Sequence, residues 1–230
     1  MACLSKKDLV SKVRVENIEI LIDAIAKQKG VVLITAHLGN YETAAQAVPC
    51  LLGLQTSAVA KKMRNAQLNR LLHNLRTRFG NRVIYKKGAL PEMMQTLRHG
   101  EMVAILMDII RRFDGVEVNF FVRRATSTPA AALQGLRCKS PIIPAFCHRN
   151  PEGKLIIQIE PPVEIKRTKD LRSDFQFNTQ LITDRVERAV RNYPEQWNWM
   201  LKRWKEYYPG LYPESKKRLE RLKKKEKKRR

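Results

Sequence analysis

Hydrophobic and polar positions form blocks along the chain that predict helices and strands in alternation. Over residues 15–29 the apolar residues recur three and four apart, which predicts a helix that ends at Gly30. The next block, 31–35, reads VVLIT, and a short, continuous, β-branched run is typical of a strand buried on both faces of a parallel sheet. Asn40 can cap a following helix over 41–52, because its side chain can accept a bond from a free amide of the first turn.

Strand and helix blocks of the same kind follow through most of the chain, without an internal repeat. Strands are expected over 56–60, 82–85, 102–107, 116–121, 142–147 and 155–159. Helices are expected over 66–78, 90–98, 129–138 and 173–192, and a further helix is expected to begin at Pro194. Strands that alternate with helices predict an α/β fold with a mostly parallel central sheet flanked by helices on both faces.

The length and composition favour one domain with a charged tail. A chain of 230 residues with 43% hydrophobic content can bury one substantial core. Residues 214–230 hold 11 basic and 3 acidic residues and almost no apolar ones, so we expect a domain over 1–213 and a tail that is a solvated helix or disordered.

Several classes of protein are disfavoured by what the sequence lacks. The longest apolar runs are far shorter than the roughly 20 residues that cross a bilayer, and the N-terminus lacks the apolar core of a secretory signal. The four cysteines are far apart and form no C-x-x-C pair, which predicts neither a metal site nor a disulfide framework and favours a reducing compartment. Glycine-rich phosphate-binding patterns are absent as well, which argues against a nucleotide cofactor.

The charge of the chain predicts an acidic partner. Lys and Arg number 45 against 22 Asp and Glu, a net charge of +23 that attracts polyanions and acidic surfaces. Nucleic-acid binding is therefore an alternative. However, no zinc finger, RNA-recognition signature or helix-turn-helix pattern occurs, and few aromatic residues are interleaved with the basic ones.

The most informative motif is His37-Leu38-Gly39-Asn40-Tyr41-Glu42. It puts an imidazole at the carboxyl end of an expected strand and a carboxylate in the first turn of the next helix, at the edge where open α/β sheets bind ligands. We expect Glu42 to fold back onto one nitrogen of His37, which would make His37 a general base. A structural pair at a helix start is the competing interpretation, although burying both charged groups deep in a core would cost several kcal/mol.

Four blocks of the chain, in order, resemble the bacterial lipid A lauroyl/myristoyl acyltransferases. VVLITAHLGNYE is similar to their H-x-x-x-x-E variant of the broader acyltransferase H-x-x-x-x-D motif. GVEVNFFVRRATSTPAAA and PEQWNWMLKRWK resemble their later Phe-Phe and tryptophan-rich segments. The remaining block consists of Lys86-Lys87-Gly88 followed by Leu97, Gly100 and Asp108. Relatives usually carry an N-terminal membrane-anchoring helix that is not found before the His block here, and Ile109 and Val122 stand where they often have Gln and Gly.

The resemblance implies an O-acyltransferase with no cofactor and no metal. It implies transfer of a fatty acyl group from an acyl carrier protein or acyl-CoA thioester to a hydroxyl of a lipid A precursor, at the cytoplasmic face of the inner membrane, with peripheral attachment. His37 and Glu42 would be the catalytic residues, and no nucleic acid is expected as a partner. The candidate substrate-binding residues are Gly39, Asn40, Arg64, Lys86, Lys87, Gly88 and Asp108.

The roles of these candidates differ. The amides of Gly39 and Asn40 would stabilise an oxyanion at a helix start. Lys86, Lys87 and Arg64 would bind phosphate or carboxylate, and Asp108 would position the substrate or a basic neighbour. Another lipid acceptor is an alternative that the motif does not exclude, and the acyl chain length is not readable from it.

Three tryptophans near the C-terminus admit two interpretations. Trp197, Trp199 and Trp204, with Met200 and Leu201, are candidates for a membrane-interface belt, with Lys202, Arg203 and Lys205 facing an anionic lipid surface. Ordinary packing of a C-terminal helix is the other interpretation. His73, His99 and His148 are expected to be surface or packing residues.

Overall fold

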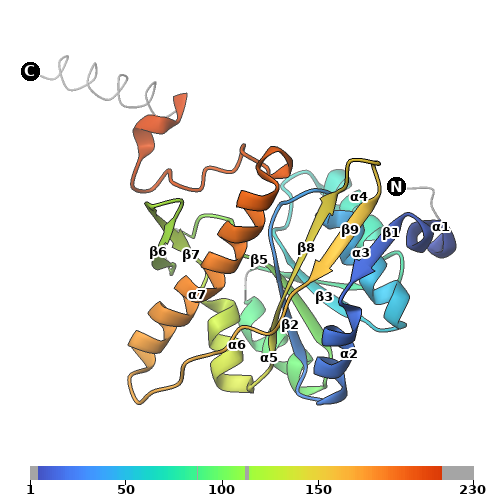
Figure 1. Cartoon of the computed structure of the whole chain (residues 1–230), viewed down its shortest axis with the longest axis horizontal. Coiled ribbons are helices and arrows are strands. Elements are labelled where there is room, and N and C mark those ends of the chain that lie inside the picture. Colours follow the sequence, from blue (N-terminus) through green and yellow to red (C-terminus); the bar gives the residue numbers. More distant parts are fainter. Residues whose placement is uncertain (1–4, 87, 112–113, 214–230) are drawn as a thin grey trace, which may run out of the picture.

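A central sheet of seven strands runs through the molecule (Figure 1). The computed structural model describes residues 5–86, 88–111 and 114–213. The strand order is β1-β9-β8-β2-β5-β3-β4, and every neighbouring pair is parallel except β8 with β9. The strands are β1 (Val13–Glu16), β2 (Val31–Thr35), β3 (Thr56–Ala60), β4 (Arg82–Tyr85), β5 (Met102–Leu106), β8 (Ile142–Arg149) and β9 (Leu155–Ile159).

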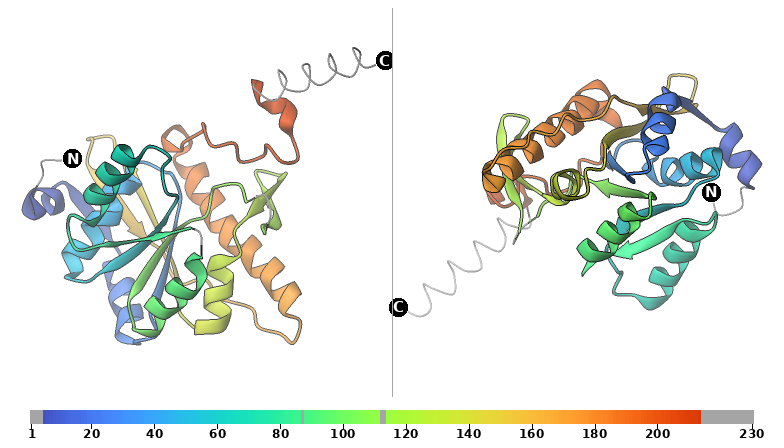
Figure 2. Two further views of the ribbon diagram at one scale, coloured as in Figure 1. Left: turned by 180° about the vertical axis from the view of Figure 1, so that it is seen from behind. Right: turned by 90° about the horizontal axis from the view of Figure 1, so that it is seen from below.

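Helices cover both faces of this sheet (Figure 2). They are α1 (Lys6–Ser11), α2 (Ile18–Ala26), α3 (Tyr41–Leu52), α4 (Ala66–Thr77), α5 (Ala89–Arg98), α6 (Ala130–Cys138) and α7 (Leu171–Asn192). The predicted α/β class with a mostly parallel sheet is therefore confirmed.

Strand β2 explains why the sequence of a central strand is apolar at every position. Side chains alternate between the two faces of a strand. Val31 and Leu33 pack in the core with α2 and α3, while Val32 and Ile34 pack in the opposite core with α5, α6 and α7. Both faces are thus buried, and only apolar residues fit.

Residues 116–127 form a separate hairpin beside α7. Strands β6 (Val116–Phe120) and β7 (Arg123–Ser127) pair antiparallel, and β6 contacts α7. The strand at β6 was predicted, but β7 was not. The turn residues Phe121 and Val122 have φ values of +51° and +59°, a conformation usually signalled by Asn-Gly or Asp-Gly, so the sequence carried no hairpin signal.

Two other expectations about secondary structure were wrong at their ends. The expected helix over 15–29 begins only at Ile18, because residues 13–16 pair with β9 as strand β1 and Asn17 turns the chain with a φ of +57°. After α7 there is a short 3-10 turn, Pro194–Gln196, because Trp197 is extended and forms a β-bridge with Leu38. The expected tail over 214–230 lies outside the described residues.

No helix among the described ranges has the length and apolar character needed to cross a bilayer.

The carboxyl ends of β2, β3, β4, β5 and β8 share one edge of the sheet, the upper edge in Figure 1. Loops from several strands therefore converge there, as they do where open α/β sheets bind ligands.

Candidate active site

His37 and Asp108 meet at this edge because their strands are neighbours in register. Thr35 of β2 lies opposite Leu106 of β5, and each of the two site residues comes two positions later. The His37 Nδ1 lies 2.8 Å from Oδ1 of Asp108, and the His37 backbone N–H donates to Oδ2 at 2.7 Å. A carboxylate on Nδ1 fixes the tautomer, so Nε2 is left as the basic nitrogen.

The carboxylate of Asp108 is fully buried and held by a third donor. Its side chain has no exposed surface, whereas that of His37 is 12% exposed. The indole Nε1–H of Trp197 donates to Oδ2 at 2.9 Å. Three hydrogen bonds therefore satisfy a carboxylate that water does not reach.

A buried guanidinium supplies charge near this carboxylate. Arg203 is 1% exposed, donates to Ser127 Oγ at 2.7 Å and lies over the ring of Phe120 at 5.0 Å. Burial lowers the pKa of Arg203 to about 10, although the nearby Asp108 carboxylate favours its charged form.

The expected hydrogen bond from Glu42 to His37 is absent from the structure, because Asp108 is the carboxylate that bonds to the imidazole. Glu42 is instead bound by Arg76 of α4, whose Nε donates to Oε2 at 3.1 Å and whose Nη2 donates to Oε1. Hydrogen bonding to Glu42 raises the pKa of Arg76. Each side chain of this pair is about 30% exposed.

His37 opens into a cavity of about 260 Å³ between α3, α4 and the sheet. Glu42 and Arg76 line it as well, and the ring of Tyr41 meets that of His37 edge-on at 4.8 Å. Small side chains, Ala45, Ala58 and Ala104, leave the space open. Burial is the main reason why the pKa of Tyr41 is raised.

A second cavity of about 340 Å³ adjoins the first. The two share five lining residues: Val59, Ala60, Lys61, Leu106 and Ile109. Lys86 and Gly88 line the second cavity, beside Arg111. Burial, and after it the charge of Arg111, lowers the pKa of Lys86. Lys87 lies outside the described residues.

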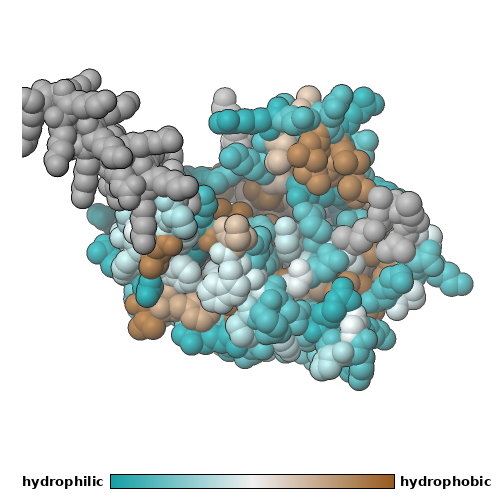
Figure 3. All heavy atoms as spheres, turned by 90° about the horizontal axis from the view of Figure 1, so that it is seen from above, coloured by the Kyte–Doolittle hydropathy of each residue, from teal (hydrophilic) through white to brown (hydrophobic). Residues whose placement is uncertain are grey.

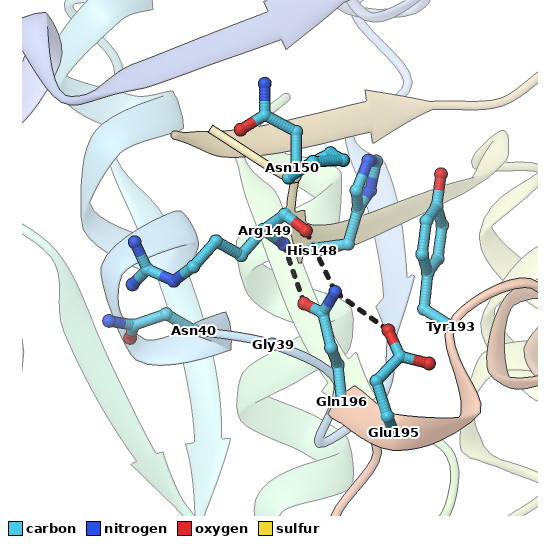
Figure 4. Close-up of a pocket in the computed structure, with 9 residues that line it drawn as sticks. Gly39, Asn40, His148, Arg149, Asn150, Tyr193, Glu195 and Gln196 are labelled. Carbon is cyan, nitrogen blue, oxygen red and sulfur yellow. Dashed lines mark hydrogen bonds between the residues drawn. The ribbon is translucent and has the colours of Figure 1, made fainter. Parts of the chain in front are cut away.

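A broader depression of about 840 Å³ lies between the Gly39–Asn40 loop, the end of β8 and the turn after α7 (Figure 4). Gly39 and Asn40 line it, whereas His37 and Asp108 do not. Gln196 closes its floor by binding the backbone of Arg149 through both amide atoms, at 2.7 and 2.9 Å. This depression does not contain the candidate base.

Comparison with known proteins identifies the family. A family model described as bacterial lipid A biosynthesis acyltransferase matches residues 1–206. The chain belongs to this family. It is 25% identical over 169 residues to the lipid A biosynthesis myristoyltransferase of Escherichia coli (strain K12), and equally to lipid A biosynthesis acyltransferase 1 of Shigella flexneri. Each match covers 71% of this chain and 51% of the relative, so the chain spans about half the length of the curated relatives it matches.

In this lipid A acyltransferase family member, four of the candidate substrate-binding residues line neither the His37 cavity nor its neighbour: Gly39, Asn40, Arg64 and Asp108. Asp108 is fully buried and bonds to His37, which agrees with the expectation that it positions a basic neighbour. The Gly39 amide donates to the carbonyl of Gln196 at 3.0 Å, and the Asn40 amide bonds to Cys147, so neither faces the His37 cavity. Arg64 is exposed beside the start of α4 and lines neither the His37 cavity nor its neighbour.

Four side chains of the site were not predicted from the sequence in their roles: Tyr41, Arg76, Trp197 and Arg203. Trp197 and Arg203 belong to the tryptophan-rich segment that was considered for a membrane belt, but both are buried. The sequence held a weak signal for Asp108. Asp108 lies two residues after the end of β5, as His37 lies two residues after the end of β2. In the described residues no cluster of His, Cys, Asp and Glu could hold a metal ion.

Gly39 sets the direction of the loop that carries His37, and replacing it is expected to destabilise the fold. Its φ is +52°, and an added Cβ would lie 2.4 Å from the carbonyl oxygen of Cys147. We expect Gly39→Ala to lower the free energy of unfolding by about 3 kcal/mol, measured by denaturant titration. Gly53→Ala is the control, because its φ is +64° but nothing lies within 4 Å, so only about 1 kcal/mol of backbone strain is expected. Equal losses in both variants would show that the contact with Cys147 is unimportant.

Proposed function

We propose that the chain transfers a fatty acyl group from a thioester to a hydroxyl of a lipid A precursor, with His37 as the general base. One observation carries the proposal. The imidazole is bound through Nδ1 to a buried carboxylate, and it lies in a cavity whose wall combines apolar side chains with the Glu42–Arg76 pair. Family membership supports the reaction class.

The first step is removal of a proton from the acceptor hydroxyl by His37 Nε2. Asp108 accepts a hydrogen bond from Nδ1–H of His37, so the proton taken from the hydroxyl binds to Nε2. The carboxylate of Asp108 then stabilises the resulting imidazolium. The hydroxyl oxygen then bonds to the thioester carbonyl carbon. Asp108 is a positioning residue here because it is buried and cannot touch the substrate.

The second step breaks the bond between the carbonyl carbon and sulfur. The tetrahedral intermediate collapses, the ester forms, and the thiolate leaves with the proton that the imidazolium returns. The amides of Tyr41 and Glu42 at the start of α3 are the candidate oxyanion donors. Both residues line the His37 cavity, and the first amides of a helix have no partner within it and sit at its positive end.

In this proposal Glu42 contributes by holding Arg76 on the wall of the His37 cavity. A guanidinium held by a carboxylate on the cavity wall is pre-organised to bind an anionic group of donor or acceptor. Lys86 and Lys61 line the neighbouring cavity and add positive charge there. The basic walls fit a phosphorylated lipid acceptor or a phosphopantetheine-borne donor, and an acyl carrier protein or CoA thioester would serve as that donor.

The two cavities bind different substrates in this proposal. We assign the acyl chain to the His37 cavity, whose small residues leave an apolar slot, and the phosphorylated acceptor to the neighbouring cavity with Lys86. Peripheral attachment at the membrane surface completes the proposal, since both substrates carry lipid chains.

Filling the slot should therefore shorten the acyl chain that is accepted. Ala58→Leu adds three carbons to a wall of the His37 cavity, and we expect it to lower kcat/KM for the longest accepted chain at least about tenfold relative to a chain shorter by four carbons. Competition between acyl donors, read by mass spectrometry of the lipid product, measures this ratio.

Ala130→Leu is the matched control, because Ala130 lines the neighbouring cavity and does not line the His37 cavity. It should leave the chain-length ratio unchanged and raise KM for the acceptor. A shift in chain-length preference in Ala130→Leu alone would reverse the assignment of the two cavities. The same product analysis tests the function itself, since wild type that forms no acylated lipid with any donor would refute it.

A further inference from the structure

Helix α4 exposes its apolar residues to an unusual degree. None of its side chains is buried, although it carries four leucines in twelve residues. Leu68 and Leu71 are 40% and 55% exposed, and Met63 in the preceding loop is 40% exposed. Single exposed apolar residues need no explanation, but three in one place indicate a partner.

The same segment is strongly and uniformly basic. Residues 61–82 hold seven Lys and Arg and no Asp or Glu. Arg76 binds Glu42 and Arg82 binds Glu101, while Lys61, Lys62, Arg64 and Arg70 are exposed. A helix with exposed leucines flanked by Lys and Arg has the chemistry of an amphipathic segment that lies in the interface of an anionic bilayer.

A second apolar area lies across the catalytic edge, at the β6–β7 turn and the segment after α7. Val122 is 93% exposed, Met200 85% and Trp199 53%. The rings of Phe121 and Trp199 are 6.3 Å apart, and the guanidinium of Arg191 lies over Phe121 at 4.6 Å. An exposed indole beside aliphatic side chains and a guanidinium suits the headgroup level of a membrane.

The first area borders the His37 cavity, and the second is linked to the residues behind it. Met63, Leu72 and Arg76 of the α4 segment line the His37 cavity, and Trp199 contacts Trp197, which holds Asp108. The view onto the carboxyl ends of the parallel strands shows apolar surface gathered toward opposite sides of one face, with a hollow between them (Figure 3).

We propose that this face, formed by the α4 segment on one side and Val122, Trp199 and Met200 on the other, docks onto an anionic lipid bilayer. Apolar side chains at two separate places suit a continuous lipid surface, and the basic residues around α4 complement its negative charge. Docking would bring the mouth of the His37 cavity to the headgroup level. The inference rests on the peripheral attachment proposed above and names the face that makes it, and it can be tested apart from acyl transfer because docking needs neither donor nor acceptor.

Co-sedimentation of the full chain with vesicles tests the proposal, with phosphatidylcholine vesicles compared to equal mixtures with phosphatidylglycerol. We expect clear preference for the anionic vesicles. Lys62→Gln with Arg70→Gln should weaken binding to them on the order of tenfold at low salt, and the loss should shrink at high salt. Leu68→Ser with Leu71→Ser should weaken binding about tenfold at both salt concentrations.

Matched controls lie at the opposite edge of the sheet. Leu171→Ser removes a leucine that is 58% exposed, and Lys27→Gln with Lys29→Gln removes two exposed charges before β2. These variants should bind vesicles as wild type does, and circular dichroism checks that all are folded. His37→Ala should also bind as wild type does, which separates failure of the catalytic proposal from failure of this one.

Three results would overturn the docking proposal. One is equal binding of wild type to neutral and anionic vesicles. Another is equal loss of binding in the α4 variants and in the controls. The third is unchanged vesicle binding by the α4 variants together with a raised KM for an acyl carrier protein donor, since α4 would then be a docking site for that acidic protein.

Discussion

The variant His37→Ala is expected to lose acyl transfer by roughly 10³-fold in kcat, because no other group in the described site can accept the hydroxyl proton from the same position. The side chain is mostly buried but sits at the mouth of a cavity, so its loss should lower the melting temperature only slightly. Product formation measured by mass spectrometry under single-turnover conditions reports the chemical step directly.

His99→Ala is the control for this experiment, since His99 is exposed at the end of α5. It should retain the activity of wild type. A purified His37→Ala protein that is folded and fully active would rule out His37 as the base, and the cavity would then have to be reassigned.

The variant Asp108→Asn is expected to lower kcat nearly as much, by roughly 10²–10³-fold, with little change in KM. An amide keeps the volume but presents both a donor and an acceptor to three N–H groups, so the Nδ1–H tautomer of His37 is no longer fixed. One buried donor is also left unpaired, which should cost about 1–3 kcal/mol of stability. Nitrogen NMR of labelled histidine should show the change of tautomer.

Glu42→Gln serves as the comparison, because it alters the other acidic residue near His37. We expect it to weaken the hold on Arg76 and to raise KM, while the tautomer of His37 stays as in wild type. A changed tautomer in Glu42→Gln, with wild-type behaviour in Asp108→Asn, would restore Glu42 as the partner of the imidazole and contradict the assignment of Asp108.

The wrong choice between these two acids illustrates where sequence patterns fail. Glu42 is near His37 along the chain, but the start of α3 directs its side chain toward Arg76 of α4. Asp108 is 71 residues away and reaches His37 only because β2 and β5 are neighbours in the sheet. Sequence separation says nothing about such a pair unless the strand order is known.

The tryptophan-rich segment also shows that contacts between distant residues decide which side chains are buried. Its composition admitted both a membrane-interface belt and ordinary packing. In the structure Trp197 bonds to Asp108 and Arg203 is buried against Phe120, so these two residues pack. Among its large apolar side chains, Trp199 and Met200 are exposed to about half or more. Composition singled out this segment, but it did not show which of its residues are buried. The β-bridge between Trp197 and Leu38 fixes Trp197 in the core.

By itself, the sequence determined the fold class, the family and most of the helices and strands. Continuous apolar runs such as 31–34 are typical of strands buried on both faces, and the block after that run placed His37 at the sheet edge and resembled the acyltransferase family. Only the tertiary structure decided the partner of His37, the separation of Gly39 and Asn40 from the cavity, and the exposure of α4. These depend on strand order and on packing between residues distant in the chain, which local periodicity does not encode.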